Sequence, residues 1–502
     1  MDAKLLGFLV FGAVVISTML VGIYASRKVK TSEDYWVGGR NLGKFITVGT
    51  QAATFIGGGM TVGWISMGYQ LGYGAFWYGI PQCLGIFVAG YFLVKPFRKT
   101  NYTSLPDFFN DIYNHDKRIN LVMTIVSIMA PVTWVAGQFS SAGRIMEGIM
   151  GIQFETAVLF AGIVVIAYAI FGGFLSVAYT DAYQFTLLVI LFAIVAPFTI
   201  LSAGGLGTIT ESAPSWMLNP LHLEGMSTIA IPIWIFMGLT EALGLQTIYQ
   251  RIYSSDSEHT ASFALKFTGW LTVIWGIVTP LMGMAVYILN PNLNPDASFS
   301  WFLAEKAPIL IAMAFMACVV MATISTADSM LNSVALNIGY DIYQRHINPK
   351  ASEKKAVRVG QAITLVFGII SIYWAMQGGL IMSFFGYASS VCSGPLVAAV
   401  FVTAFAKKKR TADGIVYGVI AGAIVGVICI FAPVLKDILS GGVMFSFATT
   451  AIVALLVGTF KQRGQEALAD GDQPQTEAQK LSGGSVMRMA LGAFAPFNWN
   501  GR

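Results

Sequence analysis

The sequence predicts an all-α integral membrane protein with about 13 transmembrane helices, each able to cross the ~30 Å hydrocarbon core of a bilayer. Of the 502 residues, 56% are hydrophobic and only 11% are charged, whereas soluble chains carry roughly a quarter charged residues. The apolar residues are gathered in long runs. Composition and grouping together exclude an ordinary soluble domain.

The apolar runs give the expected helices in chain order. They lie near residues 5–26, 45–70, 74–96, 119–148, 154–175, 182–204, 228–250, 261–290, 307–343, 357–379, 381–406, 411–434 and 441–460. The first run is longer than the roughly 7 to 15 residue core of a cleavable signal peptide, so we expect it to remain as the first helix.

The positive charges predict the orientation of the chain. With the N-terminus outside, the predicted cytoplasmic loops and the tail hold 26 of the 30 Lys and Arg residues. The positive-inside rule then indicates an N-terminus outside and a C-terminus in the cytoplasm. Short basic loops at 354–355 and 407–410 are typical of this rule, with a lipid or partner site as the alternative. The net charge of +5 indicates no nucleic-acid partner.

Cysteine and histidine positions argue against a metal framework and against an enzyme. The four cysteines lie inside apolar runs without paired metal-site spacing, so they behave as small hydrophobic residues. The four histidines lie in predicted loops or at helix ends, and no nucleophile and base pair is in view.

Two of the runs are interrupted by glycines. The second run contains Gly57, Gly58 and Gly59, and the seventh contains Gly238 and Gly244. A broken span is expected where it lines a cavity, and transporters with inverted repeats place a discontinuous helix in each repeat. The alternative is that these glycines only let helices pack closely.

The spacing of the two breaks, five helices apart, predicts the domain organisation. Residues 45–227 form the first inverted repeat and 228–406 the second. Before them come the first helix and a cytoplasmic loop, 1–44. After them come two further helices, 407–460, and a polar tail, 461–502, whose composition is typical of a disordered cytoplasmic segment.

Hydroxyl and carboxylate side chains cluster in the ninth run. Ser325, Asp328 and Ser329 are three or four residues apart and share a helix face. Hard alkali cations prefer oxygen ligands, which hydroxyls, carboxylates and the free carbonyls of a broken helix supply. Sodium fits this ligand set. The alternative is that the hydroxyls bond back to their own helix.

Ionisable groups at bilayer depth cost several kcal/mol, so they usually mark a pathway or have a partner. Asp328 lies well inside its span. Glu241 lies at a helix break and is expected to meet a cationic group or a hydrogen-bond partner. Asp181 is placed at the cytoplasmic start of its helix, where a carboxylate is also a natural N-terminal residue.

Four segments resemble the sodium/solute symporter family, which includes sodium/proline, sodium/galactose, sialic acid, pantothenate and high-affinity choline carriers. The resemblance extends to about residue 460. It is carried by Asp34-Tyr35-Trp36-Val37-Gly38-Gly39-Arg40-Asn41-Leu42-Gly43, Ser104-Leu105-Pro106-Asp107-Phe108-Phe109, Phe171-Gly172-Gly173-Phe174-Leu175-Ser176-Val177-Ala178-Tyr179-Thr180-Asp181, and Ser325-Thr326-Ala327-Asp328-Ser329-Met330-Leu331-Asn332-Ser333 followed by Asp341-Ile342-Tyr343.

The resemblance implies a LeuT-type core of two inverted five-helix repeats and a main sodium site. The ligands of that site would be the carbonyls of Ala53, Ile56 and Ala322 and the hydroxyls of Ser325 and Thr326. A second sodium site of some relatives corresponds to Asp181, Asp328 and Ser329. A carboxylate replaces a serine there, as in the choline branch, so a protonatable Asp328 is a rival explanation.

The same comparison suggests a solute pocket with aromatic, amide and carboxylate side chains. Its residues would be Thr54, Phe55, Gly58, Trp134, Gln138, Glu241, Gln246 and Tyr387. This mixture suits a small solute with an amine, such as an amino acid or a derivative. Choline carriers surround a quaternary ammonium with aromatic rings, but Phe55 and Leu245 stand where two of the expected tryptophans would be.

The resulting expectation is a sodium-coupled secondary active symporter, not an enzyme, in the plasma membrane, which for a bacterial protein is the inner membrane. It would import a small polar organic solute together with Na+ by alternating access, with the lipid bilayer as its surroundings. Two alternatives stay open. One is a proton-coupled or uncoupled carrier of the same fold, and the other is a transporter of choline-like quaternary amines.

Overall fold

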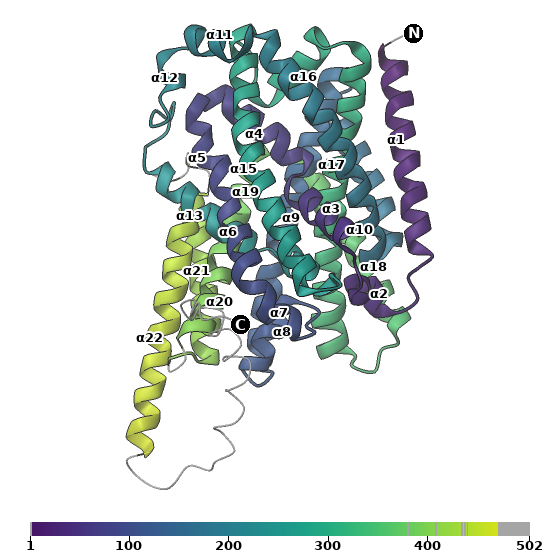
Figure 1. Ribbon diagram of the computed structural model, residues 1–502. Helices are drawn as coiled ribbons and strands as arrows, with labels where there is room; N and C mark the ends of the chain where they lie inside the picture. Colours follow the sequence, from purple (N-terminus) through teal and green to yellow (C-terminus); the bar gives the residue numbers. More distant parts are fainter. Residues whose placement is uncertain are drawn as a thin grey trace, which may run out of the picture.

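The computed structural model describes residues 3–378, 381–406, 409–432, 435, 438 and 440–469. Within these residues every regular element is helical, and long helices run side by side as a bundle (Figure 1). Short helices gather at its two ends. In Figure 1, α11 and α16 lie at the same end as the N-terminus, whereas α2, α7 and α8 lie toward the other end.

The elements follow one another along the chain in this order: α1 (Ala3–Ser26), α2 (Ser32–Val37), η1 (Gly38–Arg40), α3 (Lys44–Phe55), α4 (Gly58–Leu71), η2 (Gly72–Ala75), α5 (Phe76–Gly79), η3 (Ile80–Gln82), α6 (Cys83–Val88), η4 (Ala89–Leu93), α7 (Val94–Lys99), α8 (Leu105–Ile112), α9 (Lys117–Met150), α10 (Phe154–Ser202), α11 (Gly205–Ser212), α12 (Ser215–Leu218), α13 (Ala230–Leu243), α14 (Gln246–Ser254), α15 (Glu258–Leu289), α16 (Pro295–Lys306), α17 (Ile309–Leu336), η5 (Asn337–Ile347), α18 (Glu353–Met376), α19 (Ile381–Ala388), η6 (Ser389–Ser393), α20 (Gly394–Phe405), α21 (Ala412–Phe431) and α22 (Val443–Ala469).

The all-helical membrane architecture predicted from the apolar runs is confirmed, and each predicted run falls on helix. In the described part of the chain, nine helices are long and apolar enough to cross a membrane. The pair α13 and α14 adds a broken span, bent by 43°. Helix α17 lies at the centre of the bundle, where it packs against α9, α10, α3 and α4.

Both glycine-rich breaks predicted from the sequence are present. The second run divides into α3 and α4, with Ile56 and Gly57 in non-helical backbone between them. The seventh run divides into α13 and α14 at Gly244 and Leu245. Because a helix end leaves its last carbonyls without helical partners, each break supplies backbone oxygens inside the bundle.

The boundary between the fifth and sixth runs differs from the prediction. The turn lies at Gly173, whose backbone has φ 57° and ψ 173°, and the following span covers Gly173–Ser202. Only glycine adopts such angles without strain. Asp181 therefore lies two turns inside a helix and is fully buried, not at a helix start as the sequence interpretation had it.

The last helix also extends beyond its predicted end. The sequence places the end of the span at residue 460, but α22 continues to Ala469. The rest of the predicted tail, 470–502, lies outside the described residues.

Two of the family-like motifs meet at the end of the bundle that holds α8. Ser104 and Asp107 form a capping box at the start of α8. The Ser104 hydroxyl donates to the buried Asp341 carboxylate over 2.7 Å, and Arg345 forms an ion pair with Asp107. These contacts fix α8 against η5.

Helices α4 and α15 cross with their backbones in contact. A Cβ atom on Gly68 would overlap the backbone of Pro280, and one on Gly283 would overlap the carbonyl oxygen of Ile65. Small residues at such crossings let membrane helices approach closely. Helix α4, the second half of this broken span, is therefore held directly against α15.

The close crossing predicts a cost for a single added methyl group. We expect Gly283→Ala to lower the free energy of unfolding by roughly 1 to 3 kcal/mol, because the two backbones must separate. The matched control is Gly207→Ala on α11, where a Cβ would meet nothing within 4 Å. Thermal unfolding of both purified variants in detergent measures the difference, and equal melting temperatures would contradict the predicted overlap.

Candidate functional site

The polar centre of the bundle is built on α17, whose residues from Val319 to Leu336 are all buried. Most of this helix is apolar, so its hydroxyls and its one carboxylate must find partners within the protein. They face the break between α3 and α4 and the middle of α10.

The Thr326 hydroxyl lies between two backbone carbonyls of different helices. Its oxygen is 3.0 Å from the carbonyl oxygen of Ala53 and 3.1 Å from that of Ala322. Ala53 belongs to the last turn of α3, where the helical ladder stops. A Cβ atom on Gly57 would overlap the Thr326 hydroxyl, so glycine is required for this approach. Three oxygens of the predicted main sodium site thus lie together.

The other two predicted ligands of that site flank this group. Ile56 is the residue at which α3 ends, with φ −96° and ψ 65°. Ser325 is buried next to Thr326, but its hydroxyl donates to Asp181 over 2.6 Å. Ser325 therefore links the group around Thr326 to a neighbouring carboxylate.

Asp181 is the acceptor at the centre of a buried hydrogen-bond network. It accepts from the hydroxyls of Thr50 over 2.6 Å, Ser325 over 2.6 Å and Ser329 over 3.2 Å. These hydroxyls come from α3 and α17, and Asp181 itself belongs to α10. The Ser329 hydroxyl also accepts from Thr54 over 3.3 Å. One carboxylate thus connects three helices near the break.

Arg251 is a residue of this site that the sequence interpretation missed. Its guanidinium is 1% exposed and lies 3.3 Å from the Asp181 carboxylate. It also donates to the Ser329 hydroxyl over 2.7 Å and to the carbonyl of Thr50 over 3.2 Å. Two of the three predicted ligands of the second sodium site therefore already contact a positive group.

The place of Arg251 in the sequence explains why the sequence interpretation missed it. It directly follows the apolar run 228–250, so it was counted among the loop cations that fix topology. In the structure α14 continues to Ser254 inside the protein. The signal that could have found it is the Asp181 carboxylate, because a buried charge requires a partner of opposite sign.

Asp328 lies on the same helix as Ser325 and Ser329 and is fully buried. Within the described part of the chain, neither of its carboxylate oxygens has a hydrogen-bond partner. Asp181 and Arg251 both lie close enough to act on it electrostatically. With Arg251 and Asp181 paired, Asp328 is the acid whose charge a bound cation or a proton would balance.

The solute pocket predicted from the sequence is partly assembled. Trp134 of α9 contacts Phe55 and Phe385, with ring centroids 6.3 Å and 4.8 Å apart. Gln138, one turn further along α9, accepts from the backbone N–H of Gly59 at the start of α4 over 2.9 Å. The Nε1 of Trp134 and the Nε2 of Gln138 are buried donors without a partner among the described residues.

Gly58 and Thr54 complete the part of the pocket at the α3–α4 break. A Cβ atom on Gly58 would overlap Val319 and Thr323 of α17, so this glycine allows the break to rest on α17. Thr54 is directed to Ser329 and thus to the cation site. The predicted solute pocket and the predicted cation site share this break.

Glu241 lies in a separate buried polar cluster at the end of α13. Gln82 of η3 and Ser389 of η6 lie close enough to its carboxyl group to interact with it, and Tyr78 lies near the same carboxylate. Both Glu241 oxygens are without a hydrogen-bond partner of good geometry among the described residues. Among the described residues, no basic side chain forms an ion pair with Glu241.

Two predicted pocket residues are not brought to this group. Gln246 accepts from the backbone N–H of Leu105 over 2.8 Å, so it faces the start of α8. Tyr387 is 36% exposed and lines a cavity next to α21. Phe385, two residues before it, contacts the ring of Trp134 instead. The sequence pattern of α19 does not fix which of the two side chains faces Trp134, because both positions lie in one apolar run.

Comparison with known proteins identifies the family. A model described as the sodium:solute symporter family matches residues 35–422. The sodium/proline symporter of Escherichia coli (strain K12) is 26% identical over 438 residues, which is 82% of this chain and 86% of that protein. The high affinity choline transporter 1 of Homo sapiens is 27% identical over 432 residues, 81% of this chain and 73% of that protein.

Solved structures agree on the fold. A substrate-bound, outward-open Na+-coupled sialic acid symporter matches with a TM-score of 0.79 at 21% identity, over 91% of this chain and 97% of that one. A nucleobase-cation-symport-1 family transporter matches with a TM-score of 0.55 at 14% identity, over 89% and 97%. Both are transporters of the LeuT fold. With its many apolar helices and a family match that spans most of its length, this multi-pass plasma membrane protein belongs to the sodium:solute symporter family.

Proposed function

We propose that the protein imports a small polar organic solute carrying an amine, coupled to Na+ that binds at the α3–α4 break. The observation that carries this proposal is the group of oxygens around Thr326, where a hydroxyl of α17 meets carbonyls of Ala53 and Ala322. Sodium prefers such neutral and anionic oxygen ligands. Membership of the sodium:solute symporter family supports the same assignment.

The position of the cation group suggests how coupling works. The ligands come from a broken helix and from α17, so a bound ion stabilises the arrangement in which these two elements are close. If that arrangement also binds solute, sodium raises the population competent for solute, and the coupling is reciprocal. One charge moving down a potential of about 100 mV releases roughly 2.3 kcal/mol.

A second sodium at Asp181, Asp328 and Ser329 would lie near the positive charge of Arg251, so that charge also needs a negative partner. The guanidinium pairs with Asp181, which leaves Asp328 as the free carboxylate of this set. Either a second Na+ or a proton would balance Asp328. The alternative of proton coupling in the same fold therefore rests on Asp328, and it predicts uptake that follows a pH gradient without sodium.

The solute class rests on the buried groups near the two breaks. Glu241 is a buried carboxylate for which a cationic amine would be a partner. Trp134 and Gln138 offer unpartnered donors beside the α3–α4 break. The rings of Trp134, Phe55 and Phe385 keep the choline-like alternative in view, because aromatic faces attract a quaternary ammonium.

We propose the predicted orientation and repeat boundaries together with this function. The N-terminus would lie outside and the C-terminus in the cytoplasm, with inverted repeats at 45–227 and 228–406. In Figure 1 the segments predicted to be extracellular, such as α11 and α16, lie at one end, and those predicted to be cytoplasmic, such as α8, lie at the other. This arrangement supports the proposed topology.

Removing the Thr326 hydroxyl should weaken sodium coupling. We expect Thr326→Val to raise the sodium concentration for half-maximal uptake roughly ten-fold or more, as for the loss of about 1.5 to 3 kcal/mol at a charged partner. The matched control is Thr323→Val on the same helix, whose hydroxyl bonds only to its own helix at Val320. Uptake of a panel of amino acids, choline, sugars and organic acids into proteoliposomes, with and without a sodium gradient, measures both. Sodium-independent uptake that is unchanged in Thr326→Val would refute the coupling mechanism.

The Arg251–Asp181 pair should behave as one unit in stability. We expect Asp181→Asn to destabilise the protein by roughly 3 to 5 kcal/mol, because it leaves a buried guanidinium without its counter-charge. The double variant Asp181→Asn with Arg251→Gln should recover part of this loss, by about 0.5 to 3 kcal/mol of coupling. Thermal melting of the two single variants and the double variant completes the cycle. Strictly additive losses of stability would show that the two side chains are not energetically coupled.

The carboxylate of Glu241 should be required for an amine-bearing solute. We expect Glu241→Gln to abolish uptake of the amine solute that the native protein carries, while protein yield and sodium-dependent stabilisation persist. Tyr387→Phe, on the exposed side of α19, should leave uptake unchanged. The same solute panel in proteoliposomes measures both variants. Transport restricted to sugars or simple carboxylic acids would overturn the assigned solute class.

A further inference from the structure

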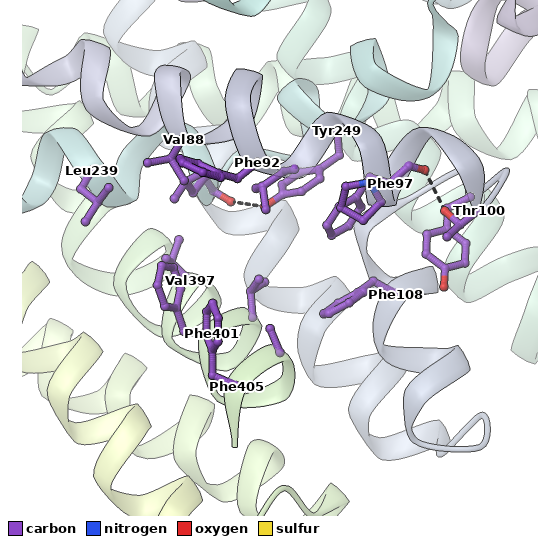
Figure 2. Close-up of a pocket in the computed structure, with 16 residues that line it drawn as sticks. Val88, Phe92, Phe97, Thr100, Phe108, Leu239, Tyr249, Val397, Phe401 and Phe405 are labelled. Atoms are coloured by element: carbon purple, nitrogen blue, oxygen red, sulfur yellow. Dashed lines mark hydrogen bonds between the residues drawn. The ribbon is translucent and has the colours of Figure 1, made fainter. Parts of the chain in front are cut away.

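A cavity of about 310 Å³ lies between the α6–α8 stretch and α20, away from the proposed cation site. Figure 2 shows its walls: Val88 and Phe92 from the α6–α7 stretch on one side, and Val397 and Phe401 from α20 facing them. Leu239 from α13 closes one end. The cavity belongs to none of the elements that carry the oxygens around Thr326.

The walls offer no polar group to a ligand. Only three of the lining side chains carry a hydroxyl, and each of these is already bonded within the protein. Thr100 donates to the carbonyl of Phe97 over 2.8 Å, and Tyr249 donates to the carbonyl of Leu243 over 2.8 Å, as Figure 2 shows. Tyr102 donates to Asp111 over 2.6 Å. A water needs two to four polar partners, so this cavity suits an apolar occupant.

The cavity borders the lipid-facing surface of the bundle. Two of its lining side chains, Phe92 and Phe405, are 38% and 47% exposed, and Tyr91 beside them is 58% exposed. Side chains with this exposure on a transmembrane helix face the bilayer. The apolar molecules that surround them are lipid acyl chains, which have direct access to the opening.

Three lysines that lie close in the chain to lining residues form what we call the basic rim. Lys95 and Lys99 lie on α7, one helical turn apart, beside the lining residues Phe92 and Pro96. Lys409 follows the lining residue Phe405 at the end of α20. Lys95, Lys99 and Lys409 are exposed, and Lys99 lies 3.8 Å from the carboxylate of Glu258. Such a basic rim at a membrane surface attracts anionic head groups.

We propose that this cavity binds one acyl chain of an anionic phospholipid, whose head group contacts Lys95, Lys99 and Lys409. The apolar walls hold the chain, and the basic rim selects the charge of the head group. The lipid comes from the leaflet that faces the basic loops, which the charge pattern assigns to the cytoplasmic side. This site lies apart from the proposed cation site, and the proposal does not rest on the proposed transport function.

The site adjoins the second helix break. Leu239 and Leu243 belong to α13 and Tyr249 to α14, and these two helices are bent by 43° where they meet. A bound chain therefore contacts both halves of the broken span. If it fits one bend angle better than another, lipid occupancy shifts the equilibrium between conformations by that difference in affinity.

The test uses the full-length protein in detergent, titrated with phosphatidylglycerol or with phosphatidylcholine of the same acyl chains. Native mass spectrometry counts the bound lipids, and thermal melting reports stabilisation. We expect phosphatidylglycerol to bind more tightly and to raise the melting temperature further. Each lysine near an anionic surface strengthens binding roughly five-fold, so the double variant Lys95→Ala with Lys99→Ala should bind phosphatidylglycerol about 30-fold more weakly. Its affinity for phosphatidylcholine should stay unchanged.

Matched variants separate this site from general lipid contact. Lys354→Ala with Lys355→Ala removes two exposed lysines from another loop and should leave phosphatidylglycerol affinity unchanged. Val397→Phe or Ala404→Trp fills the cavity and should abolish retention of both lipids, with Ile190→Trp on the exposed face of α10 as the control for added bulk. If one filled variant does not fold, the other decides. Equal binding of the two lipids, or full retention in a folded filled variant, would overturn the proposal.

Discussion

The contact between Arg251 and Asp181 holds together the elements that form the centre of the protein. Arg251 comes from α14, the second half of one broken span, and Asp181 from α10. Thr50, Ser325 and Ser329 attach to the same pair from the other broken span and from α17. Desolvating both charges is costly, and the cost is offset in part because these three hydroxyls bond to the pair. The geometry of the oxygens around Thr326 therefore depends on this pair.

Sequence patterns predicted the architecture well because bilayer physics is restrictive. Every backbone amide in hydrocarbon needs a partner, so long apolar runs can only be helices and glycine-rich interruptions can only occur inside the protein. The family resemblance implies that Thr326 lies beside Ala53, and in the structure their oxygens are 3.0 Å apart. Their role as sodium ligands stays a prediction.

Side-chain direction and charge pairing were harder to predict from the sequence. Tyr387 and Phe385 are two residues apart, and only the rotation of α19 decides which one meets Trp134. Arg251 looked like a loop cation because the apolar run ends just before it. Asp181 looked like a helix-terminal acid because nothing in the pattern distinguishes a turn at Gly173 from one several residues later. Each of these features depends on tertiary packing.

The crossing of α4 and α15 has a mechanical consequence. Two backbones that touch at Gly68 and Gly283 have no layer of side chains between them that could slide or repack. Helices α4 and α15 therefore form one stiff lever. The joint of that lever is the non-helical pair Ile56 and Gly57, which lies beside the oxygens that we propose as sodium ligands. A rotation at this joint would therefore move the carbonyl oxygens of Ala53 and Ile56 relative to Thr326.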